Sequence, residues 1–252
     1  MKRVRLIAAG LLAVLSAAPV FAKEKKPKPK VERETIQLKG VPRFCYYQIP
    51  ATDDPKAPLP TVVLVHDQNN YATQVTKYWH DYAAHEGFII VAPQSLTFAQ
   101  WSGTTDGPDL FHGCVDAIDK IHPVDRSRIY IFGDTGGGVY TMAMALYDST
   151  YYAAAAVHEA VMDAANFGMM NQAQRKIPIA MWMGDRDPML SINIAQNEEN
   201  AFKAKGFPFF LHVMSFTSGG YEGSADVVNE GAWKFFKQYQ LPGAAGAAPA
   251  AK

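Results

Sequence analysis

The segment with the clearest chemical pattern is Gly133–Gly138, which reads Gly-Asp-Thr-Gly-Gly-Gly. It follows the β-rich run Arg128–Phe132 and precedes an apolar stretch with helical spacing, so it joins a strand to a helix. The hydroxyl residue Thr135 has a glycine two positions before it and another two positions after it. This is the layout of a nucleophile elbow, a sharp turn that presents a hydroxyl for attack. A nucleotide-binding loop is disfavoured, because the segment lacks the lysine of a P-loop and the G-x-G-x-x-G spacing.

A hydroxyl nucleophile needs a base, and His158 is the best placed of the seven histidines. It ends the β-rich run Ala153–Val157, which should neighbour the strand before Thr135. Two interpretations of His158 stay open, a relocated base and a structural histidine at a strand end, and the second is favoured. The close pair His80 and His85 is five residues apart and off one helical face, so we predict no metal and no cofactor.

The elements that would position these residues alternate along the chain. Strands are expected at Thr35–Leu38, Arg43–Ile49, Thr61–Val65, Phe88–Val91, Arg128–Phe132, Ala153–Val157, Ile177–Met183 and Phe209–Ser215. Helices are expected at Thr73–Glu86, Asp109–Ile121, Gly137–Tyr147, Ser191–Lys205 and Ala225–Gln240. The first two strands should form a hairpin, and the later alternation predicts parallel strands with helices on both faces. We therefore predict a three-layer α/β domain over residues 35–241, with an eight-stranded, mostly parallel sheet and its site beyond the carboxyl ends of the strands.

Seven segments in this order strengthen the interpretation: Val63–His66, Phe88–Gln94, Trp101, Val124–Ile131, Gly184–Asp187, Gly219–Tyr221 and Trp233–Phe236. Together with the elbow they resemble the α/β-hydrolase fold. The chain is most similar to secreted polyhydroxybutyrate depolymerases and to feruloyl or acetylxylan esterases, over roughly residues 42–240.

The resemblance implies a degenerate catalytic triad. Thr135 stands where the family has its serine, Tyr221 stands where it has the base histidine, and only the acid, Asp187, is retained. Tyrosine has a reference pKa near 10, so Tyr221 is a poor base at neutral pH. The β-branched Thr135 also crowds a turn in which positive φ is already unfavourable.

The resemblance also implies an altered oxyanion loop. His66 opens this loop, but Asp67 and Gln68 follow where the family has glycines. A carboxylate here opposes the negative charge that develops during acyl transfer. Asp134 and Gly136, on either side of Thr135, complete the expected oxyanion and pocket residues.

We therefore predict an exported, esterase-like α/β-hydrolase that is a pseudoenzyme and keeps a pocket for a ligand or partner. The alternative is an active carboxylic-ester hydrolase that uses Thr135 with Asp187 and a relocated base such as His158. Trp101 and Tyr221 lie in glycine-bearing loops and are expected as pocket walls, suited to a small ester or to a sugar or aromatic ring.

The N-terminus predicts export. Three basic residues precede an apolar run over Leu6–Val20, and Val20-Phe21-Ala22 supplies small residues at the −3 and −1 positions of a cleavage site. We expect residues 1–22 to be a signal peptide, 23–34 a basic Pro/Lys-rich tether, and 242–252 an Ala/Gly/Pro-rich tail. The mature protein should be periplasmic or secreted, with no transmembrane segment once the signal is removed.

Charge and cysteine content set further limits. The chain has 24 basic and 24 acidic residues, but eight of the basic ones lie within the first 30 residues beside a single acid, so the body is acidic. An acidic body is a poor nucleic-acid binder. An oxidising compartment permits a disulfide between Cys45 and Cys114, but buried free thiols are slightly favoured because lone cysteines often pack as small hydrophobes.

Overall fold

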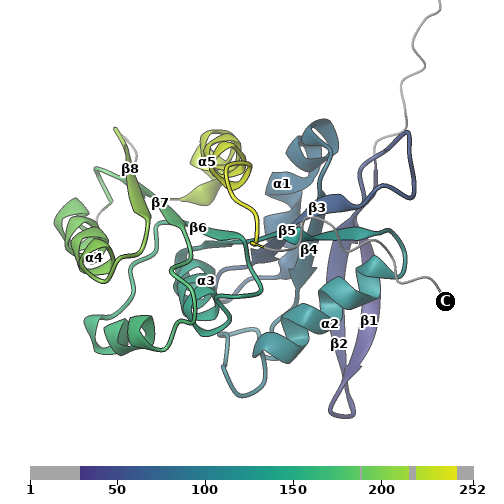
Figure 1. Ribbon diagram of the computed structural model, residues 1–252, viewed down its shortest axis with the longest axis horizontal. Coiled ribbons are helices and arrows are strands. Elements are labelled where there is room, and N and C mark those ends of the chain that lie inside the picture. Colours follow the sequence, from purple (N-terminus) through teal and green to yellow (C-terminus); the bar gives the residue numbers. More distant parts are fainter. Residues whose placement is uncertain (1–28, 188, 216–219, 243–252) are drawn as a thin grey trace, which may run out of the picture.

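One eight-stranded sheet forms the centre of the computed structural model, which describes residues 29–187, 189–215 and 220–242 (Figure 1). The strands are β1 (Glu32–Leu38), β2 (Val41–Gln48), β3 (Leu59–Val65), β4 (Ile89–Pro93), β5 (Val124–Asp134), β6 (Ala154–His158), β7 (Ile179–Gly184) and β8 (Phe209–Met214). Their order across the sheet is β1-β2-β4-β3-β5-β6-β7-β8. The β1–β2 and β2–β4 pairs are antiparallel and the remaining pairs are parallel, which confirms the predicted fold class.

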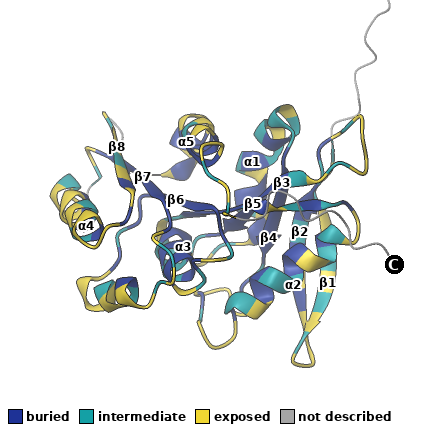
Figure 2. Ribbon diagram, in the orientation of Figure 1, coloured by how far each residue is buried: buried dark blue, intermediate teal, exposed yellow. Residues whose placement is uncertain are grey.

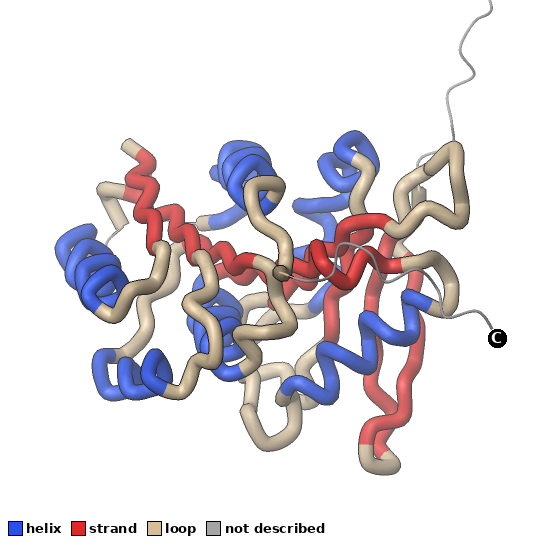
Figure 3. Tube along the Cα trace, viewed as in Figure 1, coloured by secondary structure: helices blue, strands red, loops and turns tan. Residues whose placement is uncertain are grey.

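Helices cover both faces of this sheet (Figure 3). They are α1 (Ala72–Glu86), α2 (Pro108–Asp119), α3 (Thr135–Tyr147), the 3₁₀ helix η1 (Ala164–Asn171), α4 (Ile192–Ala204) and α5 (Tyr221–Phe236). Helices α1 and α5 pack on one face, and α2, α3, η1 and α4 pack on the other. The signal peptide and most of the expected tether and tail lie outside the described residues, although β1 begins at Glu32, inside the range expected for the tether.

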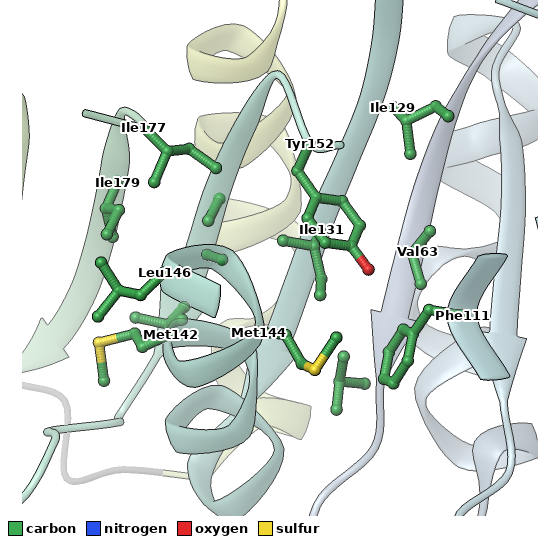
Figure 4. Close-up of a cluster of buried hydrophobic side chains, with 14 of the residues drawn as sticks. Val63, Phe111, Ile129, Ile131, Met142, Met144, Leu146, Tyr152, Ile177 and Ile179 are labelled. Carbon is green, nitrogen blue, oxygen red and sulfur yellow. The ribbon is translucent and has the colours of Figure 1, made fainter. Parts of the chain in front are cut away.

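The central strands are buried on both faces (Figure 2), and apart from Thr61 and His158 their residues are apolar instead of alternating with polar ones. In β3, Val63 and Val65 point into the core under α2 and α3, whereas Val62 and Leu64 point into the core under α1 and α5. Figure 4 shows the first of these cores, where strand residues such as Ile131 meet side chains such as Met144 of α3. The parallel strands therefore hold their carboxyl ends at one common edge, where the candidate site lies.

The predicted start of the last helix was wrong. Helix α5 begins at Tyr221 and not at Ala225, because Gly220 has a φ of 86° and turns the chain directly into the helix. Tyr221 is therefore the first residue of a helix and not part of a glycine-bearing loop.

The preference for free thiols was also wrong. Cys45 of β2 and Cys114 of α2 form a disulfide, with Cα atoms 5.6 Å apart. Helix α2 packs across β1 and β2, which brings two residues together that are 69 positions apart in the sequence. Across the described chain, the helices are all too short or too polar to span a membrane.

Candidate functional site

The turn between β5 and α3 has the geometry of a nucleophile elbow. Thr135 has a φ of 51°, a strained value for a β-branched residue. A Cβ atom at Gly133 would lie 2.2 Å from the Thr141 hydroxyl, and one at Gly137 would lie 2.4 Å from the His66 carbonyl oxygen. Both glycines are therefore required by close packing around the turn. The Thr135 hydroxyl donates a hydrogen bond to the Asp134 carboxylate at 3.1 Å and not to a histidine of the described chain.

The backbone N–H group that follows the elbow residue is already occupied. In α/β-hydrolases this group, here of Gly136, donates to the oxyanion. It donates instead to Asp67 Oδ1 at 2.9 Å, and the Gln68 N–H donates to the same oxygen at 2.7 Å. Burial raises the pKa of Asp67, and the two N–H groups oppose this shift. The loop after β3 thus places its own carboxyl group on the N–H that α/β-hydrolases use for the substrate oxygen.

His66 is a buried scaffold residue of this loop. Its Nδ1 lies 2.7 Å from the Asp67 carbonyl oxygen, and its Nε2 lies 3.2 Å from the Ser95 N–H. A neutral ring with its proton on Nδ1 satisfies both contacts, and burial lowers the pKa of His66. The Trp101 indole N–H donates to the His66 carbonyl at 2.8 Å. Trp101 is therefore buried against His66, where it fixes the loop.

His158 lies at the centre of the site, buried at the end of β6. Its Nδ1 is 2.7 Å from Asp134 Oδ1, and its Nε2 is 3.1 Å from the Ser224 hydroxyl of α5. A serine, a histidine and an aspartate are thus linked in the order that is used in serine hydrolases. Sequence reasoning placed His158 and Asp134 in the site but missed Ser224. Ser224 lies one helical turn after Tyr221, so it could have been placed on the same side of the helix as Tyr221. That step requires knowing that α5 begins at Tyr221.

Tyr221, at the position of the family's base, is buried, and its hydroxyl and ring both make contacts within the protein. Its hydroxyl donates to Oδ1 of Asn229, eight residues further along α5, and its ring centroid lies 5.3 Å from that of His158. Burial raises the pKa of Tyr221 well above its ordinary value. The Tyr221 hydroxyl is therefore uncharged at every pH at which the protein is expected to be folded, and the side chain serves to pack the helix against the sheet.

Asp187, at the position of the family's acid, is hydrogen-bonded within its own loop. Its Oδ1 accepts from the N–H groups of Met189 and Leu190, at 2.7 and 2.6 Å. A second acid near His158, besides Asp134, is the buried Glu159, whose Oε1 lies 4.0 Å from His158 Nε2 and accepts from the Gly184 N–H at 2.7 Å. Burial raises the pKa of Glu159. The structure thus gathers Thr135, His158 and Tyr221 around the elbow, with Asp187 engaged in its own turn.

A small cavity of about 20 Å³ lies beside the elbow, close to the room that one water molecule needs, while Thr135 itself is exposed and is not part of its lining. It is lined by His66, Asp67, Asn70, Gln74, Val75, Tyr78, Asp134 and Tyr221. Among the described residues, no three His, Cys, Asp or Glu side chains are grouped so that they could hold a metal ion.

Fold and elbow together define an α/β-hydrolase fold, and the comparisons agree. S-formylglutathione hydrolase from Staphylococcus aureus superposes with a TM-score of 0.67 at 15% identity, over 82% of this chain and 96% of that one. A ferulic acid esterase gives 0.67 at 16% identity, over 84% and 98%. A dienelactone hydrolase from Klebsiella pneumoniae subsp. pneumoniae gives 0.65 at 19% identity, over 84% and 99%.

The sequence comparisons find a weaker likeness. The chain is 26% identical over 160 residues to a bifunctional acetylxylan esterase/xylanase from Neocallimastix patriciarum. The match covers 60% of this chain but only 22% of that protein. No family model matches the sequence.

Proposed function

We propose that this chain is an exported α/β-hydrolase-fold protein that does not hydrolyse esters and acts by binding a ligand or partner. The observation that carries the proposal is the hydrogen bond between the Gly136 N–H and the Asp67 carboxylate. A hydrolase keeps this donor free for the charge that develops on the substrate, and losing such a donor costs about 10²–10³ in rate. Here the Gly136 N–H is already bound to the Asp67 carboxylate, which carries the same negative charge that the substrate oxygen would develop in the transition state.

The other groups at the elbow support the same conclusion. The Thr135 hydroxyl donates to Asp134, and the two ring nitrogens of His158 contact Asp134 and Ser224 instead of Thr135. Tyr221 is held neutral by burial. The N-terminal signal pattern supports export to the periplasm or medium.

Esterase assays test this proposal. We expect background hydrolysis of p-nitrophenyl acetate, of feruloylated sugars and of acetylated xylan, the substrate named for the matched curated protein. Thr135→Ala should leave that background unchanged, and a fluorophosphonate probe should not label Thr135. Turnover that Thr135→Ala abolishes would overturn the proposal.

A gain-of-function series provides the converse test. Asp67→Gly, Thr135→Ser and Tyr221→His together should raise hydrolysis above each single variant, since nucleophile, base and oxyanion donor act as one unit. Asp67→Asn is the matched control, because it removes the charge but keeps an acceptor on the Gly136 N–H.

A second candidate function is an active hydrolase with His158 as its base. The chain of contacts from Ser224 through His158 to Asp134 favours it. In this case a fluorophosphonate probe labels Ser224 or Thr135, and His158→Ala abolishes labelling and turnover together. Peptide mapping of the labelled protein identifies which hydroxyl reacted. The absence of labelling at both residues would exclude this candidate.

A further inference from the structure

A cavity of about 970 Å³ lies between the start of the described chain and helix α1. Val31 and Tyr46 of β2 line it together with three cations, Lys30 and Arg33 from the N-terminal side and Lys77 from α1. The residues of this lining do not border the small cavity beside the elbow, so the two sites are separate. We call the larger one the basic cavity.

The three cations of the basic cavity are not neutralised by carboxylates of the described chain. Lys30, Arg33 and Lys77 are all exposed, and none of them forms an ion pair with another residue that the structure describes. The Arg33 guanidinium lies 4.9 Å from the centroid of the Phe44 ring, and Lys77 Nζ lies 5.9 Å from that of Tyr78. Contacts with aromatic faces leave the N–H groups of both side chains available to the oxygens of an anion.

The two acids in the lining, Glu32 and Asp81, are engaged by other groups. The Tyr47 hydroxyl donates to Glu32 Oε2 at 2.8 Å. Asp81 Oδ1 lies 3.1 Å from His80 Nδ1, and the Pro29 carbonyl oxygen lies 2.9 Å from His80 Nε2. Carboxylate and carbonyl oxygens only accept hydrogen bonds, so both contacts are hydrogen bonds only when the His80 ring carries two protons and a positive charge. His80 then balances Asp81, and the basic cavity keeps a surplus of positive charge.

The basic segment at the N-terminus leads directly into this cavity. Residues 23–30 hold five lysines and one glutamate, and the last of these lysines, Lys30, belongs to the lining. The contact between Pro29 and His80 joins the end of this segment to α1. The remainder of the chain has more acidic than basic residues, so positive charge is concentrated at this end. Such a separation of charge attracts one end of a protein to an anionic surface and repels the rest from it.

We propose that the basic cavity, together with residues 23–30, binds the phosphate groups of an anionic lipid surface. This inference goes beyond the proposed function, because it concerns where the protein is held and not what the elbow does. Lys30 and Arg33 lie on one wall and Lys77 lies on another, so the site offers separate cations to several lipid headgroups. Clusters of Lys and Arg bind anionic membranes in this way, and each cation strengthens the binding about fivefold.

Sedimentation with lipid vesicles tests this inference on the chain that begins at Lys23. Vesicles of phosphatidylglycerol mixed with phosphatidylcholine are the anionic probe, and vesicles of phosphatidylcholine alone are the comparator. We expect binding to the anionic vesicles and not to the comparator. Raising the salt concentration from about 0.05 M to about 0.3 M should lower the partition coefficient at least about tenfold, because salt screens contacts between exposed charges.

A triple variant separates the basic cavity from the segment before it. Lys30→Gln, Arg33→Gln and Lys77→Gln together should lower the partition coefficient at least about 20-fold, since each cation contributes about fivefold. Residues 23–28 are unchanged in this variant, so binding by that segment alone would be unaffected. Circular dichroism and urea unfolding confirm that the variant is folded.

A matched triple variant controls for the change in net charge. Lys176→Gln, Lys203→Gln and Lys205→Gln remove the same charge beside β7 and α4, toward the opposite edge of the sheet from β1. Lys176 Nζ lies 4.3 Å from the centroid of the Phe207 ring, so this variant also loses one contact between a cation and an aromatic ring. It should lower the partition coefficient less than about threefold, because these charges lie far from the lipid surface and are screened.

Three outcomes of these assays would overturn the inference: equal binding to both kinds of vesicle or to neither, a partition coefficient that the cavity variant leaves unchanged, or equal losses in the cavity variant and its control. Calorimetry with inorganic phosphate and with hexagalacturonate tests other sources of negative charge. Binding of either soluble anion without binding to vesicles would assign the basic cavity to that anion and would also overturn the inference. The proposed function fails separately, because hydrolysis abolished by Thr135→Ala would refute the non-catalytic assignment and leave vesicle binding as measured.

Discussion

Glu198 of α4 is buried, and no cation from the described residues pairs with it, so the stability of the fold depends on pH. Its two carboxyl oxygens share one donor, the Met162 N–H, at 3.1 and 3.2 Å. Burial raises the pKa of Glu198 to about 8 from its ordinary value of 4.5. We predict that Glu198→Gln, which stays neutral and keeps an oxygen for the Met162 N–H, stabilises the protein at neutral and alkaline pH.

The sign and size of the effect follow from the two pKa values. The folded state holds the Glu198 proton up to about pH 8, while the unfolded state loses it near 4.5, so stability falls as pH rises between these values. The advantage of Gln over Glu should therefore grow by about 1.4 kcal/mol per pH unit in this window. Between pH 5.5 and 7.5 the change in that advantage should be about 2 to 3 kcal/mol, and above pH 8 it should level off.

Urea unfolding followed by tryptophan fluorescence at pH 5.5, 7.5 and 9 measures this difference, with the disulfide intact. Glu230→Gln is the control, because Glu230 is an exposed residue of α5 that pairs with Lys234. Its effect should be less than about 1 kcal/mol and nearly constant with pH. An advantage of Glu198→Gln that stays constant within about 0.5 kcal/mol from pH 5.5 to 9 would refute the reasoning.

Three further predictions concern crosslinks, processing and the buried ion pair. Replacing both Cys45 and Cys114 by Ala should lower the free energy of unfolding by about 2 to 4 kcal/mol, because the bond closes a loop of 69 residues; thiol counting on the denatured, unreduced protein should find no free thiol, and two would contradict it. Intact mass of protein from the cell envelope should show a mature chain that begins at Lys23, whereas an uncleaved chain held in the membrane would contradict the export signal. Arg43→Met should lower the free energy of unfolding by about 3 kcal/mol, because it leaves Asp106 as an uncompensated buried charge; a loss below about 1 kcal/mol in urea unfolding would contradict this.

Much of the fold could be predicted because its signal is local. The β-rich runs and the helical spacing between them suffice for a parallel sheet with a hairpin at its start, since β1 and β2 are joined by Lys39 and Gly40, both at positive φ. The 3₁₀ helix η1 was missed, because its eight residues carry no amphipathic period. The disulfide was missed because it depends on α2 packing over β2, which no local pattern records.

The candidate site divides in the same way. The elbow, Asp67 and His158 were predicted from motif positions and strand ends, because the carboxyl ends of parallel strands meet at one edge. The partners of these residues could not be predicted. That the Ser224 hydroxyl faces His158 depends on the start of α5, and that Asp67 reaches the Gly136 N–H depends on the path of the loop after β3. A hydrogen bond between distant segments depends on the direction in which each side chain points. The spacing of residues along the sequence does not determine that direction.

The glycines of the elbow explain why the motif resembles an esterase even where the proposed function involves no hydrolysis. Gly133 is required because a side chain there would meet Thr141, and Gly137 is required because a side chain would meet the His66 carbonyl. Both demands come from packing α3 against the ends of β3 and β5, so they hold whether or not position 135 attacks a substrate. The strained φ of Thr135 follows from the same tight turn, and the hydrogen bond from Gly136 to Asp67 helps to hold that turn closed. A glycine pattern of this kind therefore identifies the joint between strand and helix, and only the groups placed around it decide which chemistry it can support.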